Sequence, residues 1–222
     1  METISVGRVA VPIDKAKQWV REYTDPMRKA GKKPYAYPAY DAFVSGSAST
    51  ELNDGDLLAP ALLNSTPSVS AVYRFQEMQE DLQAALRAHP DRPLVAMAAD
   101  AVTAKVRDLY QVLDDDRGRH GKRGQGGTTL SKILHRKHPQ SLPLHDRWVR
   151  LCYVGSDAPV PTGRRSWADY MVRVTLAMRE DLVQHQDALY ALTEEVLGDT
   201  ALTDLRLIDI LAWTSQGVSP SN

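Results

Sequence analysis

The residue types best suited to chemistry lie in a short glycine-rich stretch, Gly124-Gln125-Gly126-Gly127-Thr128-Thr129, which runs directly into an apolar-patterned segment. Glycine tolerates positive φ and lets another backbone approach closely. The first turn of a helix that begins behind such a turn has N–H groups without intrahelical acceptors, and these groups bind phosphate. The stretch therefore predicts a phosphate-binding turn formed by Gly124, Gly126, Gly127, Thr128 and Thr129. A flexible linker ahead of a helix is the alternative.

The charge pattern around this turn has one sign. From position 117 to position 137 the chain carries seven basic residues and no acid, although its formal net charge is only -1. So local a run indicates a bound phosphate or polyanion, and a solvated basic loop is the alternative. Lys122, Arg123 and Lys132 lie nearest the glycines and are the basic residues that we expect to contact phosphate.

Asp146 is the only acid between Gly121 and Arg150. It precedes the apolar-patterned segment Arg147–Val154, so its position predicts the N-cap of a helix, a role worth ~1 kcal/mol.

The pattern G-x-G-x-x-T-x-x-x-I-L resembles the second half of the helix-hairpin-helix motif of the DNA glycosylase superfamily that includes endonuclease III. In that superfamily the catalytic aspartate follows about eighteen residues after a hairpin position that is lysine in the lyase-type enzymes. In this chain the hairpin position is Thr128, and Asp146 follows it by eighteen residues in the segment PLHDRWV. The resemblance covers the thirty residues from Gly121 to Arg150.

The resemblance implies a monofunctional DNA glycosylase, a hydrolase, because Thr128 stands where the lyases have lysine. Breaking an N-glycosidic bond builds positive charge on the sugar, and one carboxylate can stabilise that cation and orient the attacking water. Asp146 is the expected catalytic residue. Duplex DNA is the expected partner, held through its phosphate backbone, and no cofactor or metal is expected. Lys132, one helical turn after Thr128, is an alternative nucleophile for the sugar.

A glycosylase also needs a pocket for the base that it turns out of the duplex. The aromatic candidates are Tyr35, Tyr37, Tyr40, Trp148 and Trp213. Of these, Tyr37, Tyr40 and Trp148 are the predicted base pocket. Aromatic residues at helical spacing more often belong to the core, which is the alternative for all five.

Composition narrows the classes of protein. Hydrophobic residues make up 43% and charged residues 25% of the 222 residues, an ordinary globular mixture. The single cysteine, Cys152, excludes an internal disulfide, a multi-cysteine zinc site and a cysteine-bound iron–sulfur cluster. No apolar run approaches the ~20 residues needed to span a bilayer, and the N-terminal segment lacks a secretion-signal pattern, so we expect a cytoplasmic protein.

The elements that must position these residues are helices. Apolar spacings of three and four predict helices over 13–23, 56–63, 68–89, 94–113, 128–136, 147–154, 167–186 and 203–216. A further helical segment follows residue 186 and ends at 197. Weak alternation of apolar residues predicts a single short strand at Ile4–Val11. Residues 114–127 are predicted to form a loop. The fold class is all-α, a single domain over residues 1–222 with a glycosylase-like architecture and the glycine-rich hairpin region at 117–150.

The chain as a whole also resembles an uncharacterised bacterial family of unknown function, through the segments YDAF, DLLAPALLN, SKILHRKHP and LRLIDILAW. That resemblance supplies no activity. Two alternatives to a glycosylase therefore stay open: a non-catalytic DNA- or nucleotide-binding protein, and a helical protein that binds a small molecule.

Overall fold

The computed structural model describes residues 2–25, 35–89, 91–120, 126–197 and 202–220. The protein is mainly helical, with one two-stranded sheet among these residues. Its buried apolar side chains form one cluster to which the N-terminal, central and C-terminal elements all contribute. The described part of the chain contains no helix that is both long enough and apolar enough to cross a bilayer.

The chain begins with a β-hairpin where a single strand was expected. Strand β1 (Thr3–Val6) pairs antiparallel with β2 (Val9–Pro12), and the chain reverses at Gly7, whose φ is +60°. A Cβ at Gly7 would lie 2.3 Å from the backbone oxygen of Cys152, so only glycine allows this close approach. The hairpin is thereby held against the middle of the chain.

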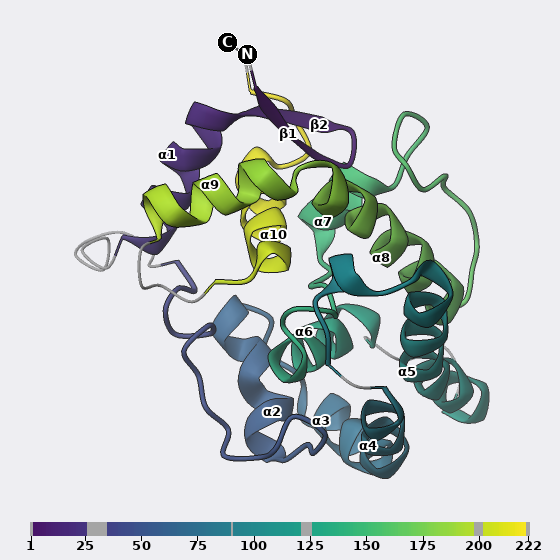
Figure 1. Ribbon diagram of the computed structural model, residues 1–222. Helices are drawn as coiled ribbons and strands as arrows, with labels where there is room; N and C mark the ends of the chain where they lie inside the picture. The colour runs from purple at the N-terminus through teal and green to yellow at the C-terminus, as the bar shows by residue number, and fades with distance from the viewer. Residues whose placement is uncertain (1, 26–34, 90, 121–125, 198–201, 221–222) are drawn as a thin grey trace.

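Helices from both ends of the chain pack together beside the hairpin (Figure 1). Helix α1 (Ile13–Thr24) packs against α9 (Gln186–Val196) and α10 (Asp204–Ser215), and both chain termini are near the hairpin. The predicted bounds of α1 and α10 agree with the structure to within one or two residues. Their buried stripes follow the spacing of three and four that predicted them.

On the opposite side of the molecule, two of the predicted helices were wrong in their bounds. The predicted helix over 68–89 is two helices, α3 (Val69–Glu77) and α4 (Gln79–Ala88), which meet at Met78. The apolar spacing continues across the break and therefore does not reveal it. The helix predicted from Leu94 begins at Ala99 as α5 (Ala99–His120), after the short 3-10 helix η3 (Leu94–Ala96).

Helix α5 also continues through residues that were predicted to form a loop. Asp114 accepts hydrogen bonds from the amides of Trp167 and Ala168, and Asp116 forms an ion pair with Arg74. These acids therefore have partners on other elements, so their polarity did not signal a loop. The remaining elements are α2 (Asp54–Leu58), the 3-10 helix η2 (Ala59–Leu63), α6 (Gly127–Lys137), α7 (Arg147–Tyr153) and α8 (Trp167–Gln184).

Helix α6 occupies the middle of the molecule, between the two groups of helices (Figure 1). It contacts α2 and η2, while α5 packs along α8 and α7 packs against α10. Leu130, Ile133 and Leu134 of α6 are fully buried, as predicted. The helix is thus a fixed support for the residues that follow it.

Candidate functional site

The loop that leads to Asp146 is pinned to α6 by side chains of that helix. The amide of His145 donates to Ser131 Oγ at 3.0 Å, and His135 Nδ1 donates to the carbonyl oxygen of Leu142 at 2.7 Å. Ser131, His135 and Leu142 are all buried. The position of Asp146 is therefore set by α6, although the two are separated by a proline-containing bend.

Asp146 is the N-cap of α7, as predicted. Its Oδ1 accepts hydrogen bonds from the amides of Trp148 at 2.7 Å and Val149 at 3.0 Å. No described residue donates a hydrogen bond to its other oxygen, Oδ2. The capping role and a catalytic role are therefore compatible, because one oxygen holds the carboxylate in place while the other is available to a ligand.

On one side of Asp146 lies a cavity of about 230 Å³, which we call the aromatic cavity. This volume is below the ~300–1,000 Å³ of sites for drug-sized ligands, so it suits one ring system. Residues from α1, α6, α10, η2 and the loop before α7 meet here. The lining residues are Tyr23, Tyr35, Ala36, Leu63, Asn64, Lys132, Leu144, Asp146, Arg206, Asp209 and Trp213.

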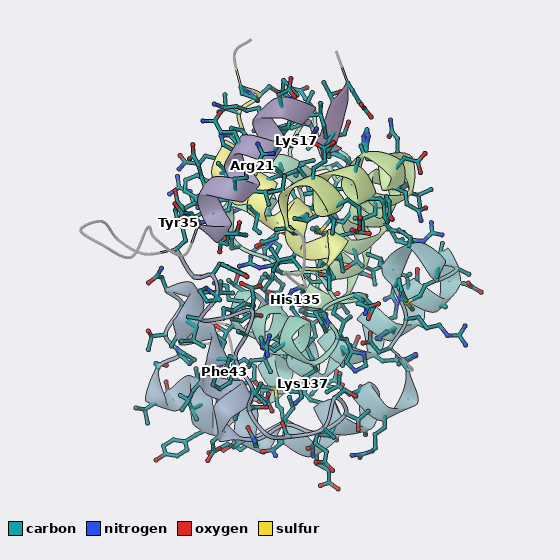
Figure 2. All side chains as sticks on the ribbon, turned by 60° about the vertical axis from the view of Figure 1, so that its left-hand side comes forward. Lys17, Arg21, Tyr35, Phe43, His135 and Lys137 are labelled. Carbon is teal, nitrogen blue, oxygen red and sulfur yellow. The ribbon has the colours of Figure 1, made fainter. Side chains whose placement is uncertain are left out.

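Three aromatic rings that contact one another give this cavity its name. Tyr23 and Tyr35 stack with ring centroids 5.1 Å apart, and Trp213 meets Tyr35 edge-on at 5.3 Å. Tyr35 lies beside the end of α1, whereas His135 lies deeper in the molecule (Figure 2). The rings supply an apolar surface next to the carboxylate of Asp146.

The three residues predicted for the base pocket are not among those that line this cavity. Tyr40 is fully buried, and its hydroxyl donates to the carbonyl oxygen of Lys132 at 2.7 Å. Tyr37 packs against the core, and the ring of Trp148 lies under the guanidinium of Arg147. Sequence spacing did not distinguish these three from Tyr35 and Trp213, which do line the cavity.

A buried arginine forms the floor of the aromatic cavity. Arg206 Nε donates to Asp41 Oδ1 at 2.7 Å, its Nη2 donates to the Tyr23 hydroxyl at 2.7 Å, and its Nη1 pairs with Asp209. Burial raises the pKa of Asp209 to about 7. This network was not anticipated, although an Arg and an Asp three residues apart in the apolar segment LRLIDIL are a signal that would have found it.

Lys132 is directed inward and not toward the glycine turn. Its side chain lines the aromatic cavity and the residue is 7% exposed, and burial lowers its pKa against the opposing effects of Asp146 and Asp209. Within the described ranges its ammonium group makes no hydrogen bond or ion pair. Lys132 is therefore placed to meet a ligand inside the cavity, and less well placed for a phosphate outside it.

On the other side of Asp146 lies an open groove of about 520 Å³, which we call the arginine groove. Among its described lining residues are three arginines and one carboxylate, that of Asp146. Thr128, at the start of α6, also lines it, so the helix N-terminus opens onto this groove as the sequence predicts. The lining residues are Thr128, His145, Asp146, Arg147, Arg150, Gly163, Arg165, Ser166, Trp167 and Tyr170.

The glycines at the start of α6 are required for packing. A Cβ at Gly127 would lie 2.2 Å from the ring of Trp167, and one at Gly126 would lie 2.5 Å from Leu113. Both glycines and Thr129 are buried, which leaves Thr128 as the half-exposed residue of this turn. Lys122, Arg123 and Gly124, also predicted to contact DNA, lie outside the described residues.

The arginine groove contains functional candidates that the sequence did not single out. Arg147 and Arg150 are three residues apart on α7, directly after Asp146, and Arg165 and Tyr170 come from the segment around the start of α8. The segment DRWVR could have revealed the first pair. The second pair is brought close only by the packing of α7 on α8.

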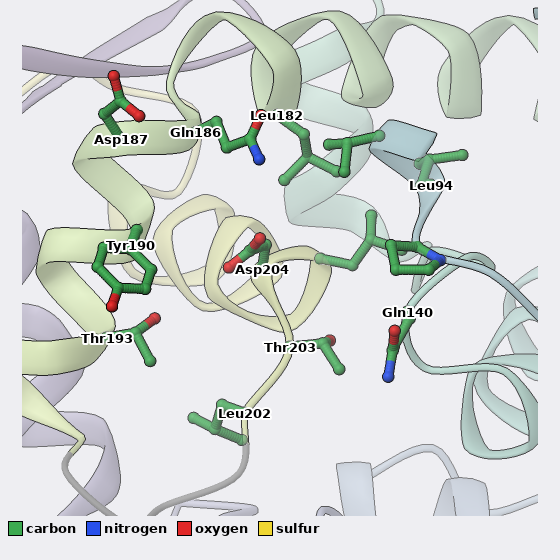
Figure 3. Close-up of a pocket in the computed structure, with 13 residues that line it drawn as sticks. Leu94, Gln140, Leu182, Gln186, Asp187, Tyr190, Thr193, Leu202, Thr203 and Asp204 are labelled. Carbon is green, nitrogen blue, oxygen red and sulfur yellow. The ribbon is translucent and has the colours of Figure 1, made fainter. Parts of the chain in front are cut away.

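A third cavity, of about 600 Å³, differs in charge (Figure 3). We call it the acidic cavity, because its described lining residues include Asp187 and Asp204 and no lysine, arginine or histidine. It lies between α9, the start of α10 and η3, and shares no residue with the other two. Its lining residues are Pro93, Leu94, Val95, Gln140, Leu182, Gln186, Asp187, Tyr190, Thr193, Leu202, Thr203, Asp204 and Leu205.

The part of the chain that the structure describes contains no group of three or more His, Cys, Asp or Glu side chains arranged to hold a metal ion. The chain belongs to a family of unknown function (DUF6308), whose model matches residues 16–216. No curated protein and no solved structure matches the chain.

Proposed function

We propose that this member of the family binds duplex DNA and hydrolyses the N-glycosidic bond of a damaged or unwanted base. The observation that carries the proposal is that Asp146 lines both the aromatic cavity and the arginine groove. A base held in the cavity and a phosphate held in the groove would leave the sugar beside the carboxylate.

The residues suit the steps of this reaction. The C1′–N bond breaks and its electron pair leaves with the base, while the positive charge that builds on the sugar faces the Asp146 carboxylate. Water adds to C1′, and its proton passes to Asp146 or to solvent. Lys132 is in the same cavity and can donate a hydrogen bond to the departing base. The small volume of the cavity favours one base over a larger ligand.

The test compares two carboxylates in two cavities. We expect the wild-type protein and the Asp204→Asn variant to generate alkali-labile sites in duplexes that carry uracil, an alkylated purine, an oxidised purine or a mismatched adenine. We expect Asp146→Asn to slow base release on the preferred duplex by ~10²–10⁴-fold. Because asparagine caps helices as well as aspartate does, a loss of fold would not explain the result.

If neither the wild type nor Asp146→Asn releases a base from any of the four duplexes, although both bind DNA, the non-catalytic DNA-binding alternative is favoured. Absence of DNA binding at low salt would favour a small-molecule binder, because phosphate contacts make affinity depend steeply on salt.

A second candidate reaction uses Lys132 as the nucleophile, and its burial in the cavity favours it. The neutral amine would attack C1′ as the C1′–N bond breaks and the base leaves with its electron pair. The bound amine would then lose a proton, and the C1′–O4′ bond would open with a proton passing to O4′, which gives an iminium that borohydride reduces to a stable protein–DNA adduct. Trapping by the wild type and by Lys105→Met, which alters another buried lysine, but not by Lys132→Met would assign this reaction. Without an adduct, hydrolysis through Asp146 remains.

A further inference from the structure

The arginine groove has positive charge that the described residues do not neutralise. Arg147 and Arg150 are exposed on α7, and the guanidinium of neither makes a hydrogen bond or an ion pair within the described ranges. Arg165 uses Nη1 to donate to the carbonyl oxygen of Pro161 at 2.7 Å, which fixes its guanidinium at the rim. Asp146 is the only acid among the described residues of the groove, and one of its oxygens already accepts hydrogen bonds from the amides of α7.

A buried histidine orients a hydroxyl in the same groove. His145 is 4% exposed, its Nε2 lies 2.8 Å from the Tyr170 hydroxyl, and its buried Nδ1 has no hydrogen-bond partner. A buried N–H group without an acceptor costs more free energy than a buried nitrogen lone pair without a donor. The proton therefore belongs on Nε2, which donates to Tyr170. The hydrogen of the Tyr170 hydroxyl is then available to an acceptor in the groove.

The ring that carries this hydroxyl is held rigidly. Tyr170 meets His145 at 5.1 Å and Trp167 at 5.6 Å, both edge-on, and Trp167 in turn packs on Gly127. The same contacts bring the first turn of α6 to the groove, where Thr128 is half-exposed. The unpaired amides and the dipole of an 11-residue helix favour an anion at this end.

We infer that the arginine groove is a phosphate site in which Tyr170 donates a hydrogen bond, Arg147, Arg150 and Arg165 supply charge, and the first turn of α6 completes the cradle. The inference rests on the proposed function for the identity of the ligand, which is the phosphodiester beside the nucleotide whose base enters the aromatic cavity. Tyr170 is a positioning residue, because it fixes the strand and does not touch the bond that breaks.

The experiment measures duplex DNA binding by fluorescence anisotropy at several salt concentrations. We expect Arg150→Gln to reduce the slope of log K against log salt by about 1, since one phosphate contact is lost. We expect Tyr170→Phe to weaken binding ~10- to 100-fold, because a hydrogen bond to a phosphate anion is lost, and to leave the slope unchanged, because the hydroxyl that donates it carries no charge. The matched controls are Arg87→Gln on α4 and Tyr190→Phe in the acidic cavity.

Two further arms identify the source of the phosphate and separate this inference from the proposed function. Perturbation of the His145 ring resonances by inorganic phosphate, and by the duplex at lower concentration, supports a phosphate site that takes a strand. Binding of DNA through Arg150 and Tyr170 with no base released keeps the phosphate site and removes hydrolysis. Base release and binding that are unchanged in both groove variants overturn the phosphate site and keep hydrolysis.

Discussion

The arginine groove and the acidic cavity are similar in size, about 520 and 600 Å³, and opposite in charge. The groove has three arginines and the start of α6, whereas the acidic cavity has Asp187 at the start of α9 and Asp204 at the start of α10. A helix N-terminus opens onto each of them, so this feature does not distinguish them. The side chains around it decide which cavity suits a polyanion.

The largest effect that we expect is an opposite response of the two regions to pH. Burial lowers the pKa of His145 in the groove to about 4, so the stability that it contributes is complete above pH 6.5 and is lost as the pH falls through 4. The shift from 6.5 to about 4 corresponds to about 3 kcal/mol. We expect the free energy of unfolding of wild type relative to His145→Asn to fall by that amount between pH 7 and pH 4.

The acidic cavity supplies the control with the reverse sign. Burial raises the pKa of Asp204, so its contribution is present below its ordinary pKa and is lost as the pH rises through the raised value. Asp204→Asn should therefore gain stability relative to wild type as the pH rises. Urea unfolding of both variants at several pH values checks the comparison, and parallel curves would contradict it.

A smaller effect is expected from filling the space at the start of α6. Gly127→Ala places a methyl group against the Trp167 ring, and we expect a loss of about 1–3 kcal/mol of stability despite the better helix propensity of alanine. Gly155→Ala is the matched control, because the nearest atom to its Cβ, Arg8 Nη1, is 3.7 Å away. If both variants unfold at the wild-type temperature, the groove wall is looser than the contacts indicate.

The helix caps beside the two regions should contribute about equally. Asp146→Ala removes the cap of α7 and Thr203→Ala removes the cap of α10, so each should lose ~1 kcal/mol of stability. Asp146→Asn should lose much less than Asp146→Ala. A large loss for Asp146→Asn would mean that the charge of the carboxylate, and not only its oxygen, supports the fold.

The smallest effect concerns DNA affinity. Asp204→Asn should change the dissociation constant for duplex DNA by less than ~2-fold, because none of the described residues that line its cavity also lines the groove, and salt screens exposed charges that are far apart. A larger change, measured by anisotropy, would place the acidic cavity near the DNA path and weaken the contrast between the two regions.

Local sequence patterns predicted most of the helices. The helix bounds that these patterns did not predict depend on tertiary packing. The stripes of α1, α6 and α10 follow directly from the spacing of apolar residues. The extension of α5 depends on partners of Asp114 and Asp116 that lie far away in the sequence. The periodicity of apolar residues carries no information about such contacts, so the charged segment 114–127 was predicted to be a loop.

The residues of the candidate site also fall into two groups, those that the local sequence predicted and those that only folding brings to the site. Asp146, Thr128 and Lys132 were found because they lie within one continuous segment. Tyr23, Arg206 and Tyr170 were missed because α1, α10 and α8 reach the site only after folding. The aromatic residues were the hardest to assign, since a ring that stabilises the core and one that lines a cavity have the same sequence pattern.

Because the side chain of Asp146 belongs to both compartments, their occupants are neighbours across one carboxylate. Two ligands that meet in this way are thermodynamically linked, and the linkage is reciprocal. By whatever factor inorganic phosphate in the groove changes the affinity of the cavity for a free base, the free base must change the affinity for phosphate by the same factor. A substrate that carries both groups brings them to this carboxylate in one molecule, so the same coupling acts within a single binding event.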